Sequence, residues 1–155
     1  MEYTGTIPVS PDGKNYKVML LLPEEVLSHW ETLLPLLEKG YDSLEVLPED
    51  LLELALREQV QLWFVTEDGV ATLAMATTFV IYPRRKVLHV MALGGKGLLG
   101  MGNYFWPKVE DFMVRNDCAV MTAYCKQAMS TMLQRFFGFT KRCDVVEKSI
   151  YGALQ

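Results

Sequence analysis

The order of apolar runs, turns and glycines limits the folds open to this chain more than any other feature. Two strand-like stretches, Gln61–Thr66 and Val70–Tyr82, flank the tight turn Glu67-Asp68-Gly69. A second turn at Pro83–Lys86 leads into a third apolar stretch, Val87–Leu93. Strands joined by such short turns pair with their sequence neighbours. This part of the sequence therefore predicts an antiparallel three-stranded meander.

The segments before the meander predict one strand and two helices. Tyr16–Leu22 is a short apolar run typical of a buried strand. Pro23 starts a helical pattern that Gly40 ends, and Pro35 inside it is expected to bend or split the helix. Pro48, which two acidic residues follow, starts a second helix.

The segments after the meander predict a crossover architecture. A nine-residue stretch with five glycines, Gly94–Gly102, comes first. The apolar spacing then predicts a helix over Asn103–Asn116, a strand over Cys118–Cys125, a helix over Ala128–Phe137 and a last strand over Cys143–Ile150. A meander followed by such crossovers gives a mixed sheet. We therefore predict an α/β (α+β) fold with a mostly antiparallel central sheet flanked by helices on both faces.

The length and composition fit one domain. We expect the 155 residues to form an N-terminal arm over residues 1–15 and a single domain over residues 16–155. No apolar run approaches the roughly 20 residues of a membrane-spanning helix, and the start lacks the pattern of a signal peptide. The three cysteines lack the spacing of a zinc site. We therefore expect a cytoplasmic protein with reduced thiols, no metal and no membrane partner.

The charge is distributed unevenly along the chain. Residues 1–60 carry twelve acids and four bases, whereas residues 61–155 carry seven acids and eleven bases. Such a distribution suits an anionic cofactor in the second part and a cationic acceptor near the first, although ordinary solvated faces explain it as well. The net charge of −4 disfavours nucleic acid as a partner, because a sequence-independent nucleic-acid binder needs a basic stripe.

The glycine-rich stretch between the meander and the next helix is a candidate anion site. Glycines let the backbone approach a ligand closely, and the free amides at a helix start point toward it. The stretch is not a Walker loop, because no Gly-Lys-Ser/Thr follows at the required spacing. The spacing Gly97-x-x-Gly100-x-Gly102 also differs from the dinucleotide fingerprint. A glycine-rich turn without a ligand is the alternative.

The element order and two motifs resemble the GNAT (GCN5-related N-acetyltransferase) superfamily. Its members carry an Arg/Gln-x-x-Gly-x-Gly/Ala loop at this place, and Gly97-Leu98-Leu99-Gly100-Met101-Gly102 is similar except at the first position. An alternative register uses Gly94–Leu99. Met132–Phe139 looks like the family's closing helix. The chain also resembles small acetyltransferase-like proteins encoded by tailed phages, for which the location would be the host cytoplasm.

The resemblance implies acetyl-CoA (coenzyme A) as a co-substrate and indicates where it binds. The pyrophosphate is expected on the loop amides, which belong to Gly97, Leu98, Leu99, Gly100, Met101, Gly102 and Asn103. The pantetheine arm is expected along the backbone of Met91, Ala92 and Leu93. Two departures from the family pattern stand out: Gly97 replaces the Arg or Gln of the loop, and Gln134 replaces the tyrosine that often acts as general acid.

Two residues are candidates for the proton transfers of an acyl transfer to an amine. His89 is expected on the same strand face as Met91 and Leu93, and histidine is suited to relay a proton near neutral pH. Tyr124 on the following strand could replace the missing tyrosine as acid. A histidine bonded within the sheet and a packed core tyrosine are the alternatives.

Three functions fit these observations. The first is acetyl transfer from acetyl-CoA to an unidentified amine on a small molecule or a protein. The second is a non-catalytic protein of the same fold, of the phage type, that binds a protein partner in an assembly or pairs as a homodimer. The third is a sensor that binds acyl-CoA without turnover. Coenzyme binding and product formation distinguish them.

Overall fold

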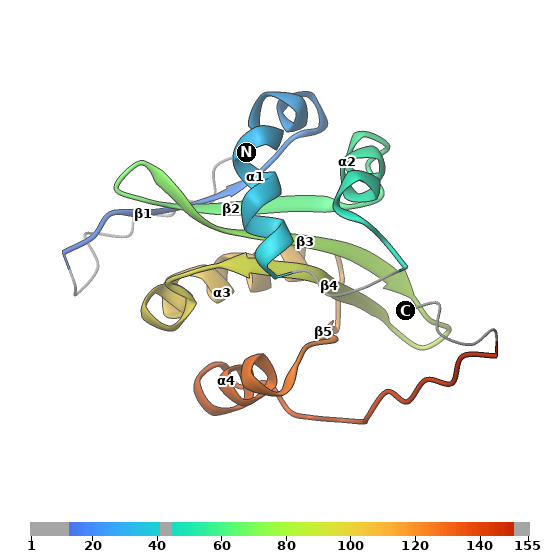
Figure 1. The fold of residues 1–155 in the computed structure, drawn as a ribbon. Coiled ribbons are helices and arrows are strands. Elements are labelled where there is room, and N and C mark those ends of the chain that lie inside the picture. Colours follow the sequence, from blue (N-terminus) through green and yellow to red (C-terminus); the bar gives the residue numbers. More distant parts are fainter. Residues whose placement is uncertain (1–12, 41–44, 151–155) are drawn as a thin grey trace. The chain divides into compact units, whose positions relative to one another are not determined.

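The computed structural model describes residues 13–40 and 45–150, so most of the predicted arm lies outside the described residues. Two compact units make up the chain, Met1–Tyr124 and Cys125–Gln155. Figure 1 shows the elements of both units along the sequence. No helix among the described residues is both long and apolar enough to cross a membrane.

The first unit contains a five-stranded sheet in the spatial order β1-β2-β3-β4-β5. The strands are β1 (Tyr16–Leu20), β2 (Gln61–Glu67), β3 (Val70–Ile81), β4 (Lys86–Gly95) and β5 (Val120–Ala123). Neighbouring strands from β1 to β4 are antiparallel, and β5 alone runs parallel to its neighbour β4. The predicted meander and the mixed, mostly antiparallel sheet are confirmed.

The turn between β2 and β3 follows from its two central residues. Asp68 and Gly69 have φ angles of 50° and 86°, both in the left-handed region. Positive φ at both central positions is the pattern of a type I′ turn, whose twist matches that of the flanking strands. The Asp-Gly pair between two apolar runs therefore forms the tight turn that the sequence predicts.

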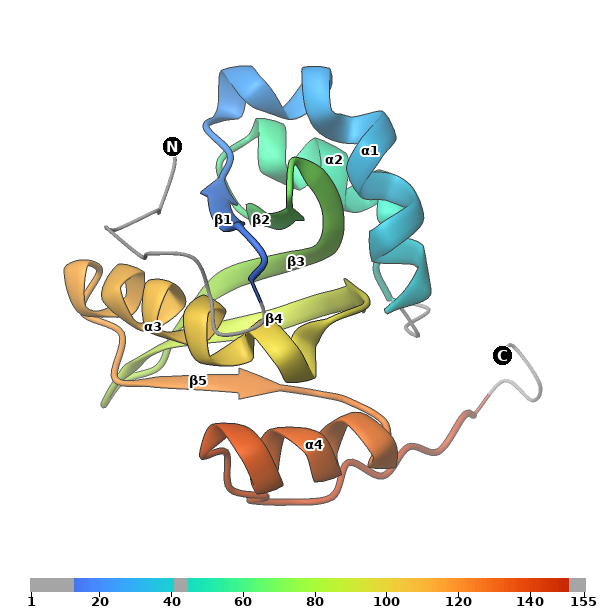
Figure 2. The same cartoon turned by 90° about the vertical axis from the view of Figure 1, so that its left-hand side faces the viewer.

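Two helices, α1 (Val26–Lys39) and α2 (Pro48–Leu56), cover one face of the sheet, and a short 3₁₀ turn, η1 (Pro23–Glu25), precedes α1. Figure 2 shows both helices together on one side of the strands. Their buried residues pack on apolar residues of β2, β3 and β4, which are Leu62, Phe64, Ala74, Ala76 and Ala92. Of the two expected effects of Pro35, a bend or a split, the split does not occur, since α1 continues past it. Leu33 and Leu37 are fully buried on either side of Pro35, and their burial holds the helix together.

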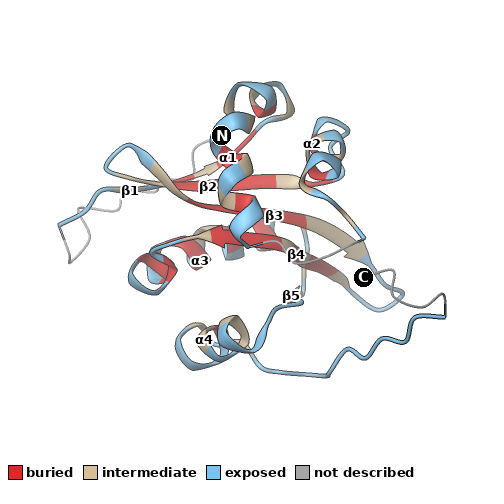
Figure 3. Cartoon of the chain, viewed as in Figure 1, coloured by how far each residue is buried: buried red, intermediate tan, exposed pale blue. Residues whose placement is uncertain are grey.

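The opposite face of the sheet packs on α3 (Leu98–Arg115). Trp63 lies between Leu62 and Phe64 on β2, so it points to the other face, where its ring meets that of Phe112 at 5.1 Å between centroids. Figure 3 shows the buried residues concentrated on the central strands and on α3. Both faces of the sheet therefore carry helices, as predicted.

The predicted start of this helix at Asn103 is wrong by five residues, because α3 begins at Leu98. Buried residues recur at helical spacing from that point onward, beginning with Leu98, Met101 and Phe105. Two glycines in a helix cost roughly 1 kcal/mol each relative to alanine. The burial of the apolar stripe outweighs this cost, so the glycine-rich stretch is partly helix.

The second unit contains α4 (Gln127–Phe137), close to the predicted bounds. Gly138 ends it with φ 76°, and the Phe139 amide donates to the Leu133 carbonyl at 3.2 Å, which is a helix end of the Schellman type. The expected last strand over Cys143–Ile150 is wrong: these residues form no strand. A strand needs a partner, and the described part of this unit contains no other strand. Its apolar side chains are exposed, Val146 at 90%.

Candidate functional site

Strand β4 pairs with β3 along most of its length, but with β5 only along its first part, up to Val90. Residues Val87–Val90 pair with Val120–Ala123 of β5. From Ala92 to Gly95, β4 pairs with β3 alone. Within the described residues, the edge of β4 that faces β5 therefore has no strand partner beyond Val90. Backbone groups on such an edge can pair with an extended ligand, as in β-strand addition.

A β-bulge separates the two parts of β4. Val90 pairs with Thr77 and Ala92 pairs with Ala76, so Met91 has no opposite residue on β3. An extra residue in one strand shifts every later side chain to the other face. The bulge thus lies where β4 loses its second neighbour.

The bulge corrects one expectation about the site. His89 pairs with Thr78, whose neighbour Thr77 accepts a hydrogen bond from Trp63 on the α3 side. His89 therefore faces the α1 side, where Met91 packs as predicted. Leu93 pairs with Met75, which shares the α3 side with Trp63. The prediction that His89 and Leu93 share a face is wrong, because a period of two does not continue through a bulge.

The two candidate proton-transfer residues lie together. The rings of His89 and Tyr124 meet edge to face with 4.6 Å between their centroids. His89 Nδ1 is 2.9 Å from the hydroxyl oxygen of Thr122 on β5. Burial lowers the pKa of His89 from its ordinary value of 6.5, so the ring is neutral at pH 7. Tyr124 is 72% exposed and is not a core residue.

The start of α3 lies directly after the unpaired part of β4. Gly97 precedes the helix with φ 87°, and the first helical hydrogen bond runs from the Met101 amide to the Gly97 carbonyl at 3.0 Å. Helix geometry leaves the amides of Leu98, Leu99 and Gly100 without an acceptor in the helix. They carry the positive end of the helix dipole.

The predicted loop amides therefore divide into two groups. Those of Gly97, Leu98, Leu99 and Gly100 stand at the helix start, whereas those of Met101, Gly102 and Asn103 belong to helical turns. A Cβ atom added at Gly100 would have no atom within 4 Å, so the space beside this residue is open.

The glycines at the end of β4 serve a different purpose. A Cβ atom at Gly94 would clash with the Leu36 carbonyl of α1 and lie 2.6 Å from the Gly40 amide nitrogen. A Cβ atom at Gly40 would in turn clash with the Leu93 carbonyl. The carboxyl end of α1 thus packs directly on the β4 backbone. Glycine at 94 is a packing requirement.

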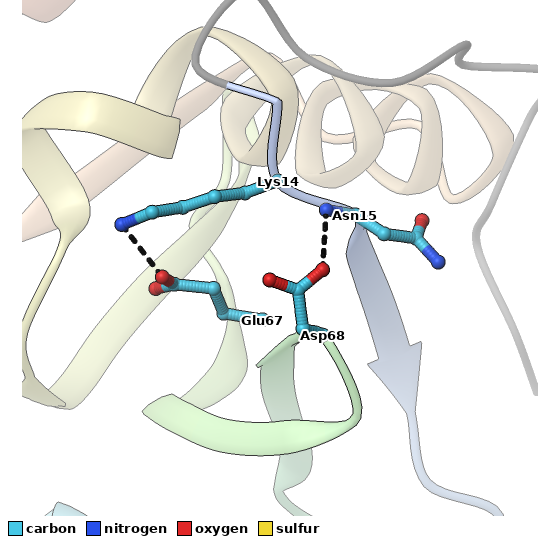
Figure 4. A network of polar contacts seen from close by, with 4 residues as sticks. All are labelled: Lys14, Asn15, Glu67 and Asp68. Carbon is cyan, nitrogen blue, oxygen red and sulfur yellow. Dashed lines mark hydrogen bonds and ion pairs between the residues drawn. The ribbon is translucent and has the colours of Figure 1, made fainter.

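One ion pair lies near the start of α3. The Lys14 ammonium pairs with Glu67 at 2.7 Å, and the Asn15 amide donates to Asp68 at 3.0 Å. Figure 4 shows both contacts. Glu67 Oε2 would lie 3.9 Å from a Cβ atom at Gly97. An anion at this helix start would therefore meet one carboxylate, whose charge Lys14 offsets.

Sequence reasoning missed Thr122 and Glu67. The sequence presents Thr122 only as one residue of an apolar strand, and its contact with His89 depends on the β4–β5 register. Glu67 reads as a turn residue, yet it is the last residue of β2. No local signal marks either of them. Gln134, at the position of the family's tyrosine, donates to the Ser130 hydroxyl within α4 at 2.9 Å.

No three potential metal ligands of the His, Cys, Asp and Glu types gather in residues 13–40 and 45–150.

Comparisons at the level of sequence identify no relative: no protein-family model and no curated protein matches the chain. Solved structures do match. A GCN5-related N-acetyltransferase from Ralstonia eutropha is 14% identical, with a TM-score of 0.64 over 89% of this chain and 100% of that one.

Two further matches are aminoglycoside acetyltransferases. One, in complex with CoA, is 16% identical with a TM-score of 0.65 over 90% of this chain and 97% of that one. The other, from an uncultured soil metagenomic sample and in complex with sisomicin, is 12% identical with a TM-score of 0.65 over 86% of this chain and 94% of that one. The chain therefore has the fold of the GNAT acetyltransferases, and the predicted resemblance is confirmed at the level of the fold.

Proposed function

We propose that this chain binds acetyl-CoA and transfers its acetyl group to an amine. One observation carries the proposal: the edge of β4 that has no strand partner within the described residues leads directly to the amide cluster at the start of α3. The β4 edge can pair with the amide groups of a pantetheine arm, and the amides at the start of α3 can bind a diphosphate. On this chain, the edge comprises the backbone of Met91–Leu93 and the amide cluster comprises Gly97–Gly100.

The chemistry needs a neutral amine and a proton for the leaving thiolate. His89 is half-buried and neutral, so it can take a proton from the substrate ammonium. The amine nitrogen then attacks the thioester carbonyl carbon, and the carbon–sulfur bond breaks. The new amide nitrogen releases its extra proton to solvent, and the proton on His89 also passes to solvent. Tyr124, whose ring contacts His89, donates its hydroxyl proton to the CoA thiolate and is reprotonated by solvent. No covalent acyl-enzyme is required.

The acceptor is proposed to be a cationic amine. The acids of the first sixty residues outnumber the bases by eight, and in the described part they lie mainly on η1, α1 and α2. His89 faces the side of the sheet that α1 and α2 cover. A negative potential on this side raises the local concentration of a positively charged acceptor. The reaction is placed in the cytoplasm, where Cys118, Cys125 and Cys143 stay reduced.

A turnover assay tests the proposal. Purified protein is mixed with acetyl-CoA and a panel of small polyamines, amino sugars and lysine peptides, and released CoA thiol is measured. We expect thiol release with at least one cationic amine and none without an acceptor. Thermal unfolding with acetyl-CoA runs in parallel, because a native-state ligand raises the midpoint by mass action. The proposal is refuted if millimolar acetyl-CoA gives no thiol release with any amine and does not shift the unfolding midpoint.

The second candidate is a non-catalytic protein that binds a partner through the same fold. The observation that favours it is the tail after α4, where Val145, Val146 and Ile150 are 70%, 90% and 78% exposed. Exposed apolar side chains on an extended segment are typical of a partner site. Sedimentation of the full chain tests this role. The role predicts that the chain self-associates, that replacing Val145, Val146 and Ile150 with Ser abolishes the association, and that no acetyl transfer occurs. Coenzyme binding without product would instead indicate an acyl-CoA sensor.

A further inference from the structure

Among the described residues, His89 has a hydrogen-bond partner at one ring nitrogen only. Nδ1 lies 2.9 Å from Thr122 Oγ1, and His89 and Thr122 are paired residues of the parallel β4–β5 ladder. Threonine is β-branched and has few side-chain rotamers, so the strand backbone fixes the position of its hydroxyl. The hydroxyl therefore presents a fixed partner to Nδ1.

The second ring nitrogen is accessible. Nε2 forms no hydrogen bond within the described residues, and it is not among their buried, unpartnered side-chain atoms. An atom with neither a partner nor full burial can be reached by solvent or a substrate. The ring of Tyr124, the residue directly after β5, packs edge to face against the imidazole.

A neutral imidazole carries one proton, and its position determines what the ring can do. If Nδ1 carries it, Nδ1 donates to Oγ1 and the Nε2 lone pair is free to accept a proton. If Nε2 carries it, the ring can only donate toward the substrate. Within the described residues, the hydroxyl of Thr122 is the only hydrogen-bond partner of Nδ1.

We propose that Thr122 is the positioning residue of the proton-transfer site: its hydroxyl accepts Nδ1–H of His89 and thereby leaves Nε2 as the proton acceptor. When Nε2 takes a proton from an ammonium, the ring becomes a cation and the substrate a neutral amine. The Nδ1–H···Oγ1 bond stays in place during this step, so no side chain has to rearrange. The proposal deepens the proposed acetyl transfer and rests on it only for the identity of the proton donor.

The tautomer can be observed without any substrate. Long-range ¹H–¹⁵N spectra of the full chain distinguish Nδ1–H from Nε2–H, and the chain contains only two histidines. H89Q assigns the signals. We expect the Nδ1–H form of His89 in the unchanged protein and in Thr122→Ser, which keeps the hydroxyl. Thr122→Val, which keeps the shape and removes the hydroxyl, should populate the Nε2–H form.

Kinetics provide the second readout. With an amine that the chain acetylates, T122V should lower kcat about tenfold, leave acetyl-CoA affinity unchanged, and be rescued by T122S. Urea unfolding of each variant checks that the fold is retained. An Nε2–H form in the unchanged protein, or a T122V protein with the same tautomer and kcat, would overturn the proposal. If no amine is acetylated, the proposed acetyl transfer fails, but the spectra still show whether Thr122 sets the tautomer of His89. The two proposals can therefore fail independently.

Discussion

The two parts of β4 differ in what their surroundings leave open. Before Met91, the strand is paired on both edges and carries His89 against Thr122 of β5. After Met91, the strand is paired on one edge in the part of the chain that the structure describes, and α1 packs on its backbone at Gly94. One bulge therefore separates a doubly paired segment, which positions side chains for chemistry, from a segment whose backbone edge can hold an extended ligand.

The glycines at the end of the strand follow the same division. Position 94 requires a glycine because the backbone of α1 packs against it, whereas Gly100 has open space beside it. In sequence they belong to one cluster. Only the three-dimensional contacts separate a packing glycine from one that leaves room for a ligand.

The largest expected effect is on stability, at the packed glycine. Gly94→Ala places a methyl group against the backbone of Leu36 and Gly40 and should lower the free energy of unfolding by about 3 kcal/mol. Gly100→Ala is the matched control, and it should leave stability unchanged or raise it by up to about 1 kcal/mol. Urea unfolding measures both. Equal losses at the two positions would show that the division between them is wrong.

The next effect is on catalysis, in the first part of β4. His89→Gln removes the proton acceptor and should lower kcat about 100-fold, while acetyl-CoA affinity stays within twofold. The change lies on the other side of the bulge from the ligand edge. Steady-state rates and calorimetry with acetyl-CoA separate the two quantities. A loss of affinity as large as the loss of kcat would assign His89 to binding.

A smaller effect is expected on coenzyme affinity, at the open glycine. Gly100→Asp should keep or raise stability, because an acid near a helix start favours the dipole. The same carboxylate should repel a diphosphate and weaken CoA binding about tenfold, which is about 1.4 kcal/mol. Gly100→Asn is the neutral control. Calorimetry at low salt compares them, and unchanged affinity in the Asp variant would place the diphosphate elsewhere.

The smallest effect is the contribution of His89 to the pH dependence of stability. Burial lowers the pKa of His89 below 6.5, so the unfolded chain binds the proton more readily than the folded chain. This contribution is complete above pH 6.5 and is lost as the pH falls through the pKa of the folded state. Urea unfolding at pH 7.5 and 5.5 should show a larger loss for the unchanged protein than for H89Q. Equal losses of unfolding free energy in the unchanged protein and in H89Q would contradict the lowered pKa of His89.

Much of the fold could be predicted because it rests on local patterns. The Asp68-Gly69 turn and the length of each apolar run determine the meander. Gly138 marks the end of α4 as predicted. These features depend on neighbours in the sequence, so they can be read from it.

The features that the sequence did not predict depend on distant contacts. The early start of α3 follows from the burial of Leu98 and Met101, which outweighs the helix propensity of glycine. The bulge at Met91 and the pairing of Thr122 with His89 are properties of strand register. His89 and Tyr124 could be identified by residue type, but their contact could not.

The central claim is that the amides at the start of α3 hold a diphosphate. A titration of ¹⁵N-labelled protein with CoA tests it directly, and the start of α2 serves as an internal control, because Glu49 and Asp50 stand in its first turn. The account predicts saturable shifts at Leu98, Leu99 and Gly100 together with Ala92 and Leu93, and none at Glu49, Asp50 and Leu51. Absent shifts, or equal shifts at both helix starts, would contradict it.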